Sequence, residues 1–122
     1  MRYMLLIYGD EQALAKRSEQ EKGAMFQQYG EFTEGIRHSG AFLAGDPLQP
    51  TGTATTVRGK NGKAVSTDGP FAETKEQLGG YYIVEAANLD EALSIASRVP
   101  AVRAGGAVEV RPIMEMGPPP RK

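Results

Sequence analysis

The pattern of hydrophobic and polar positions begins with residues 2–8, a short run that is apolar at nearly every position. Such a run predicts a β-strand, in which alternate side chains point to opposite faces of a sheet. One face of this strand carries Tyr3, Leu5 and Ile7, and the other carries Met4, Leu6 and Tyr8. Both faces are therefore expected to need a covering layer.

Two later stretches show the spacing of amphipathic helices. Residues 19–38 follow Ser18, which forms a capping-box pattern with Glu21, and residues 89–98 follow the N-cap residue Asn88. The first apolar stripe comprises Met25, Tyr29, Phe32 and Ile36, with Phe26 and Thr33 beside them, and the second comprises Leu89, Ala92, Leu93 and Ala96. Each stripe predicts a helix that covers one face of a sheet.

Further strands are predicted where short apolar or β-branched runs lie between turn residues. These runs are 41–45, 53–58, 63–67, 81–85 and 107–111. Asn61-Gly62 is the strongest hairpin signal in the chain. Residues 10–17 predict a short, weak helix, and residues 68–80 predict an irregular loop with room for one helical turn.

The resulting order is β-α-β, a hairpin and a second β-α-β, which predicts an α+β, ferredoxin-like fold. We expect one domain over residues 1–116 and a flexible tail at 117–122. Two helices cover only one face of such a sheet, so Met4, Leu6 and Tyr8 lack a covering layer. A homodimer with its two sheets packed face to face would supply one. The alternative is that these three side chains lie under the hairpin or the weak first helix.

The composition excludes several classes of site. The chain has 122 residues, no cysteine and one histidine, which excludes disulfides, thiolate catalysis, cysteine-ligated metals and a multi-histidine metal site within one chain. Its 14 basic and 15 acidic residues argue against bulk binding to nucleic acid or a membrane surface. We expect no signal peptide, no membrane span and no cofactor.

Charged residues cluster in the loop after residue 67, which makes it the first candidate for chemistry. Asp68, Glu73 or Glu76 could act as a base or ligand anchor, and Lys75 could bind an anion. The alternative is a self-capped turn with solvated charges. Catalytic residues cannot be assigned from this pattern.

The same loop contains residues that would shape the backbone. Gly69 and Pro70 predict a turn, and Phe71 is expected to enter apolar surroundings and anchor the loop. Gly79 and Gly80 permit a bulge or a close backbone approach where the next strand starts.

A second candidate lies in the last strand. Glu109 and Arg111 alternate with two valines, so they would face the space between two subunits and either hold a ligand or form an ion pair near a sheet edge. Asp46, before a proline, is most simply a turn residue. His38, the single histidine, falls on the wet side of its helix, which argues against a catalytic role.

The loop is also the centre of a family resemblance. Asp68-Gly69-Pro70-Phe71, continuing through Glu73-Thr74-Lys75-Glu76 to Gly79-Gly80-Tyr81, resembles the signature of the YCII-related family and, more closely, of its branch named after the Asp-Gly-Pro-Phe motif. Further matches are Gly45-Asp46-Pro47-Leu48, Thr55-Thr56-Val57-Arg58, Leu89-Asp90-Glu91-Ala92 and Glu109-Val110-Arg111-Pro112. The resemblance runs from about residue 2 to residue 113.

This resemblance implies a bacterial, cytoplasmic protein that forms a ferredoxin-like dimeric α+β barrel. Members of the branch are often encoded beside extracytoplasmic-function sigma factors, which suggests a signalling link. Some members of the wider family have a histidine–aspartate pair suggested to be catalytic near the first helix. Here the histidine lies at the far end of that helix, so the pair is not carried over.

These observations lead to three functional hypotheses. The first is a homodimer that binds a small polar molecule in or near the space between the sheets, with minor enzymatic activity an open possibility. The alternative is a regulatory or interaction module associated with a sigma factor. In the third, the polar loop is only a structural latch.

Overall fold

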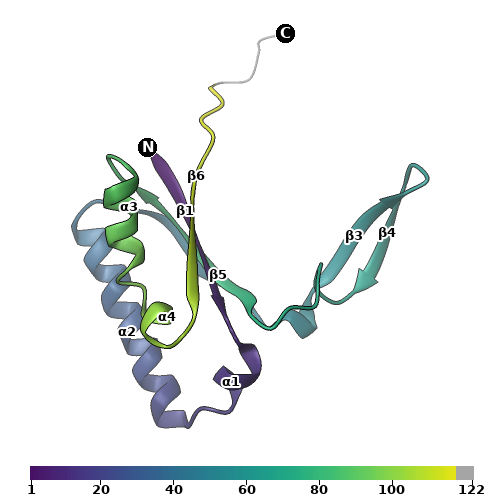
Figure 1. The fold of residues 1–122 in the computed structure, drawn as a ribbon, viewed down its shortest axis with the longest axis horizontal. Coiled ribbons are helices and arrows are strands. Elements are labelled where there is room, and N and C mark those ends of the chain that lie inside the picture. The colour runs from purple at the N-terminus through teal and green to yellow at the C-terminus, as the bar shows by residue number, and fades with distance from the viewer. Residues whose placement is uncertain (118–122) are drawn as a thin grey trace.

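A computed structural model describes residues 1–117 and shows a four-stranded antiparallel sheet with helices on one face (Figure 1). The strands are β1 (Arg2–Gly9), β2 (Phe42–Pro47), β5 (Gln77–Glu85) and β6 (Ala107–Pro112), in the order β2-β5-β1-β6. This order places the two β-α-β units around two central strands. The predicted α+β, ferredoxin-like fold is confirmed. The predicted tail lies outside the described residues, apart from Gly117.

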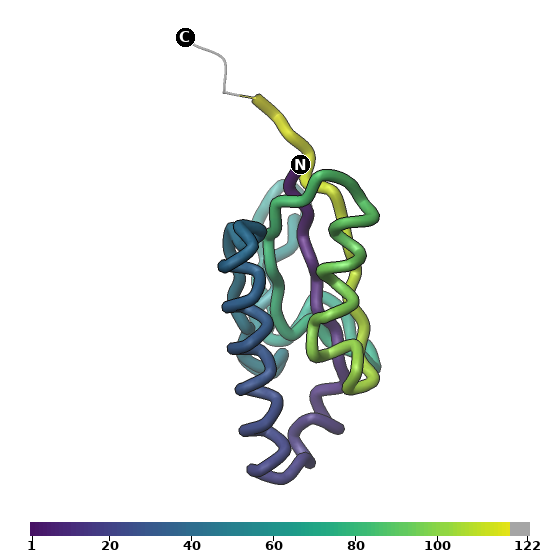
Figure 2. Tube along the Cα trace, turned by 90° about the vertical axis from the view of Figure 1, so that its left-hand side faces the viewer, coloured from purple at the N-terminus to yellow at the C-terminus, as the bar shows by residue number. Residues whose placement is uncertain are grey.

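The helices form a single layer over the sheet (Figure 2). They are α2 (Glu19–His38), α3 (Leu89–Ala96) and α4 (Pro100–Arg103), and the shorter α1 (Glu11–Ala15) follows β1 directly. The predicted caps are present: Ser18 and Glu21 form the reciprocal capping box, and Asn88 accepts a hydrogen bond from the amide of Glu91. Local sequence therefore fixes where α2 and α3 begin.

The core lies between this helix layer and one face of the sheet. Its buried residues include Tyr3, Leu5 and Ile7 from β1, Tyr82 and Val84 from β5, Phe32 and Ile36 from α2, and Ala92, Ile95 and Ala96 from α3. The ring of Tyr82 packs edge-on against Phe32, with 5.2 Å between the ring centres. The hydroxyl of Tyr82 shares a hydrogen bond with Thr33, so no polar group is buried there without a partner.

Two details of the predicted helix stripes are wrong. In α3, Leu89 and Leu93 are 49% and 46% exposed, because Ile95 rather than these leucines lies with Ala92 and Ala96 on the buried side. In α2, Phe26 is 83% exposed. Each helical residue is rotated by about 100° from the one before it. Because Phe32 and Ile36 face the core, Phe26 points away from it.

β3 (Thr55–Lys60) and β4 (Lys63–Asp68) form a separate two-stranded sheet, which we call the arm. Asn61 and Gly62, with φ of 52° and 78°, make the predicted two-residue turn at its tip. The arm projects from the body on the side of the sheet away from the helices (Figures 1 and 2). Every residue of β4 is exposed.

Strand β5 begins earlier than predicted, at Gln77 instead of residue 81, and the preceding loop contains no helical turn. The two glycines lie inside the strand, beside a register shift between Ile7 and Tyr8. A methyl group added at Gly80 would lie 3.1 Å from the carbonyl oxygen of Asp46. The predicted bulge and close backbone approach are therefore confirmed. The two glycines that allow them are part of β5, whereas the sequence placed them before the strand.

Candidate functional site

The face of the sheet opposite the helices has no covering layer within the described chain, and we call it the open face. In β1, Tyr3, Leu5 and Ile7 point to the core, so Met4, Leu6 and Tyr8 point to the open face. These three side chains are half-buried. Strand pairing puts Ile83 beside Met4 and Tyr81 beside Leu6. The centre of the open face is thus an apolar strip made of Met4, Leu6 and Ile83.

Strand β6 forms one polar border of this strip. Val108 and Val110 pack against the core, which turns Glu109 and Arg111 to the open face beside Leu6 and Met4. The Nε of Arg111 lies 3.1 Å from Oε2 of Glu109, and the hydroxyl of Tyr8 donates to Oε1 of Glu109 at 3.4 Å. The charged pair thus lies on the face away from the helices and its two members neutralise each other, whereas its position in a space between two subunits stays a prediction.

The opposite border is formed by Asp46 of β2 and Tyr81 of β5. The hydroxyl of Tyr81 donates a hydrogen bond of 2.9 Å to Oδ2 of Asp46. This hydrogen bond and the negative charge of the carboxylate raise the pKa of Tyr81 above its ordinary value, so the ring hydroxyl keeps its proton. Asp46 is therefore a strand residue of the open face, and its interpretation as a turn residue is wrong.

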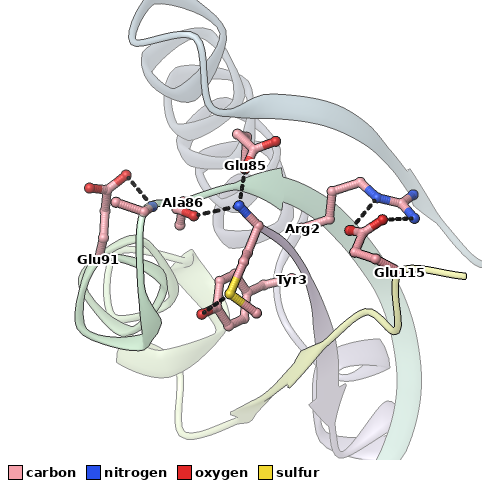
Figure 3. Close-up of polar contacts among 8 residues, drawn as sticks. Arg2, Tyr3, Glu85, Ala86, Glu91 and Glu115 are labelled. Carbon is pink, nitrogen blue, oxygen red and sulfur yellow. Dashed lines mark hydrogen bonds and ion pairs between the residues drawn. The ribbon is translucent and has the colours of Figure 1, made fainter. Parts of the chain in front are cut away.

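One end of the open face is held by a charged cluster at the start of β1 (Figure 3). Arg2 donates from Nε and Nη2 to the two carboxylate oxygens of Glu115, at 3.2 and 3.3 Å. These hydrogen bonds lower the pKa of Glu115 and raise that of Arg2. The N-terminal ammonium contacts Glu85 and donates to the carbonyl of Ala86. The cluster ties the segment after β6 to the first strand.

The charged loop residues do not join this face. Asp68 ends β4 opposite Thr55, and Glu73, Lys75 and Glu76 are exposed in the loop between the arm and β5. No hydrogen bond or ion pair within residues 1–117 connects these four side chains to Glu109 or Arg111. The role of these four side chains as a base, ligand anchors or an anion partner stays a prediction.

The backbone role of the loop motif is confirmed only in part. Gly69 has a φ of 109°, which other residues rarely adopt, and its amide donates to the carbonyl of Ala54. The amides of this turn make no hydrogen bond to the carboxylate of Asp68 within the described chain. Phe71 is 74% exposed and packs against the guanidinium of Arg58, 4.9 Å from the ring centre, so the expectation of an apolar anchor is wrong.

Other sites carry less chemistry. His38 is exposed in the last turn of α2, as predicted. Among residues 1–117 no cluster of histidine, cysteine and carboxylate side chains could hold a metal ion, and no helix is long and apolar enough to cross a membrane. Two open depressions of about 450 and 290 Å³ lie near Met1 and Arg98 and between α2 and α4. They lie away from the polar borders of the open face.

Comparison with known proteins assigns the chain to a family. The YCII-related domain matches residues 1–117. The chain belongs to the YCII-related domain family. An uncharacterized protein of Rhizobium meliloti (strain 1021) is 37% identical to this YCII-related chain over 114 residues, covering 93% of it and 92% of the relative.

A solved structure shares the fold of this YCII-related chain at low identity. It is 5-chloro-2-hydroxyhydroquinone dehydrochlorinase from Burkholderia phenoliruptrix AC1100, in complex with 2,5-dihydroxybenzoquinone. The TM-score is 0.56 at 18% identity, and the similarity covers 95% of this chain and 96% of the enzyme. This similarity supports the ferredoxin-like architecture.

Three residues of the open face were missed as site residues: Tyr8, Tyr81 and Asp46. The alternation along β1 and β5 already assigns the two tyrosines to the face that lacks helices. The pairing of Asp46 with Tyr81 depends on the register between β2 and β5. That register requires the bulge beside Leu43, and no local pattern in the sequence predicts this bulge.

Proposed function

We propose that two copies of this YCII-related chain face each other through their open faces and bind a small molecule between the sheets. The observation that carries the proposal is the composition of the open face. An apolar strip of Met4, Leu6 and Ile83 lies between the polar pair Glu109–Arg111 and the polar pair Asp46–Tyr81. Apolar walls with a few placed polar groups are typical of small-molecule sites.

The apolar strip favours a covering partner. Met4, Leu6 and Ile83 are only half-buried, and completing the burial of such a side chain stabilises a protein by roughly 1 kcal/mol. A second copy related by a two-fold axis presents the same strip, so apolar surface would pack against apolar surface. The apolar strips of the two copies would then provide the floor and the roof of the ligand space.

The polar borders favour a ligand with oxygen substituents. The side chain of Arg111 is 71% exposed, and its Nε lies 3.1 Å from Oε2 of Glu109. Its two terminal nitrogens are oriented by that ion pair and form a fork that suits a carboxylate or a phenolate. The hydroxyls of Tyr8 and Tyr81 can accept hydrogen bonds from the same ligand, since each already donates to a carboxylate.

The ligand class that fits these features is a small planar ring with hydroxyl, carbonyl or carboxylate groups. A flat ring would contact the apolar strip with its faces and the polar borders with its edge. The structurally similar dehydrochlorinase was solved with 2,5-dihydroxybenzoquinone, a ring of this kind, which supports the choice of class. We propose binding as the function, because no reacting group on the open face is identified by the geometry.

A ligand panel tests this proposal. Hydroxylated benzoates and hydroxyquinones are screened for an increase in the melting temperature of the wild-type chain, and hits are confirmed by calorimetric titration. Arg111→Gln is expected to weaken the best hit at least tenfold, because a lost charged hydrogen bond costs about 1.5–3 kcal/mol. Arg103→Gln, in α4 on the helix side, is the matched control and should bind like the wild type.

Two outcomes would overturn the proposal. One is a panel in which no compound raises the melting temperature. The other is a ligand whose affinity is unchanged in Arg111→Gln or equally reduced in Arg103→Gln, because the ligand would then bind away from the open face.

A further inference from the structure

Within residues 1–117, the arm contacts the rest of the chain at its base and through Arg58, whose Nη2 donates to the carbonyl oxygen of Phe71 at 3.2 Å. The two strands of the arm pair with each other, and the base is fixed by hydrogen bonds from Gly69 to Ala54 and from the Thr56 hydroxyl to Gly69. Val57 is 65% exposed and Val65 is 43% exposed. A two-stranded hairpin alone is at best marginally stable in water, so the arm needs a surface to pack on.

The direction and length of the arm suit a facing molecule. It leaves the body on the side of the open face, and its tip lies far from the sheet (Figure 1). Each of its strands has six residues, which corresponds to about 20 Å at the usual rise of a strand. A four-stranded sheet is about 15 Å wide at the usual strand spacing. The arm is therefore long enough to cross the body of a second copy.

The chain exposes more surface than a compact monomer of its mass, in part because the arm and the segment after β6 are extended. The chain exposes 9035 Å², whereas a compact folded monomer of 13.1 kDa exposes about 6,400 Å². Five residues lie outside the described range, and even a fully unfolded segment of that length adds only about 800 Å². The remaining excess of roughly 1,800 Å² matches what one subunit buries in a large, permanent dimer.

The two faces of the arm differ in charge. Opposed residues in the strand register share a face, so Thr55, Val57, Gly59, Ala64 and Ser66 lie on one face, with Asp68 at its base. Thr56, Arg58, Lys60, Lys63, Val65 and Thr67 lie on the other. The first face is small and uncharged over most of its length, and the second carries three cations. Charged residues are depleted at interface cores, which favours the first face as the contact face.

We propose that the arm of each copy packs through its uncharged face on the body of a second copy and closes one side of the ligand space. This inference rests on the proposed function and adds to it a wall of the site that belongs to the partner. A two-fold axis makes the exchange reciprocal, so each site is incomplete without the other chain. The basic face, with Arg58 over the ring of Phe71, stays in water.

A matched set of arm variants tests the inference by sedimentation velocity over a concentration series. Val57→Glu and Ala64→Glu place a carboxylate on the uncharged face, one on each strand. Val65→Glu makes the same change on the basic face and is the control. We expect the dimer dissociation constant to rise at least tenfold in Val57→Glu and Ala64→Glu and to stay within threefold of the wild type in Val65→Glu. Circular dichroism checks that each body remains folded.

The outcomes separate this inference from the proposed function. If the wild type is a dimer and neither Val57→Glu nor Ala64→Glu weakens it, the arm does not hold the partner, and the open-face site still stands. If Val65→Glu dissociates the dimer as strongly as the other two variants, the assignment of the contact face is overturned. If the wild type is a monomer at all concentrations, both the arm contact and the paired ligand site are overturned.

Discussion

Tyr29 is a core residue whose ionisation the fold disfavours. It lies on α2 among the side chains that pack against the core. Burial, with a smaller electrostatic contribution from the neighbouring Tyr82, raises the pKa of Tyr29 from 10.0 to about 12. The folded state therefore holds the proton of Tyr29 more tightly than the unfolded state does, and the stability that follows is complete below pH 10 and is lost as pH rises toward 12.

Replacing Tyr29 with phenylalanine should remove this alkaline dependence. The variant keeps the ring in the core but has no group to ionise, so its urea midpoint is expected to fall less than that of the wild type between about pH 9 and pH 11. Urea unfolding at a series of pH values measures the difference. Parallel curves for the two proteins would contradict the assignment of this titration to Tyr29.

The sequence predicted some site residues because their environment follows from alternation alone. Glu109 and Arg111 lie between valines that face the core, so their orientation follows from the two-residue period of a strand. Asp68, Glu73, Lys75 and Glu76 have no such constraint, because the loop conformation depends on contacts outside it. The density of charged residues marked this loop as a distinctive segment, but it did not show whether their side chains lie close together.

At the scale of elements, α2 combines a strong cap with an unfavourable interior. Its capping box satisfies the first amides of the helix, whereas Gly23, Gly30 and Gly35 weaken the helical backbone. A methyl group added at any of these glycines would meet no atom within 4 Å in a single copy. Packing against the sheet, rather than helix propensity, therefore holds this element together.

Gly23→Ala should stabilise the chain by about 0.5–1 kcal/mol, because alanine lowers the entropy of the unfolded helix segment and meets open space in the folded one. Urea unfolding at neutral pH measures the change. The control of opposite sign is Gly106→Ala, whose methyl would lie 2.5 Å from the carbonyl oxygen of Tyr8. That variant should lose about 1–3 kcal/mol of stability, and a stabilised Gly106→Ala would contradict the close approach of Gly106 to the backbone of β1.

The element boundaries show where sequence patterns work and where they do not. Both ends of α2 and the start of α3 were predicted because side-chain caps and a terminal glycine act locally. The start of β5 was wrong because its first residues include two glycines, which favour a loop when only local propensity is considered. Here pairing with Tyr8 and Pro47 outweighs that propensity.

At the scale of the whole molecule, one chain has a complete core on one side of its sheet and an incomplete surface on the other. The open face carries a half-buried apolar strip, and the arm extends from the same side with Val57 and Val65 exposed. Both features have one explanation if two copies pack together, because each copy then covers the strip and the arm of the other. The double-sided apolar pattern of residues 2–8 already indicated this need, whereas the separation of the arm from the body did not follow from the sequence.

The most direct measurement is the molar mass of the wild-type chain in solution by light scattering across the micromolar range. We expect a mass of twice 13.1 kDa that persists on dilution. A mass of 13.1 kDa at every concentration would contradict it, because the apolar strip and the arm would then stay exposed to water.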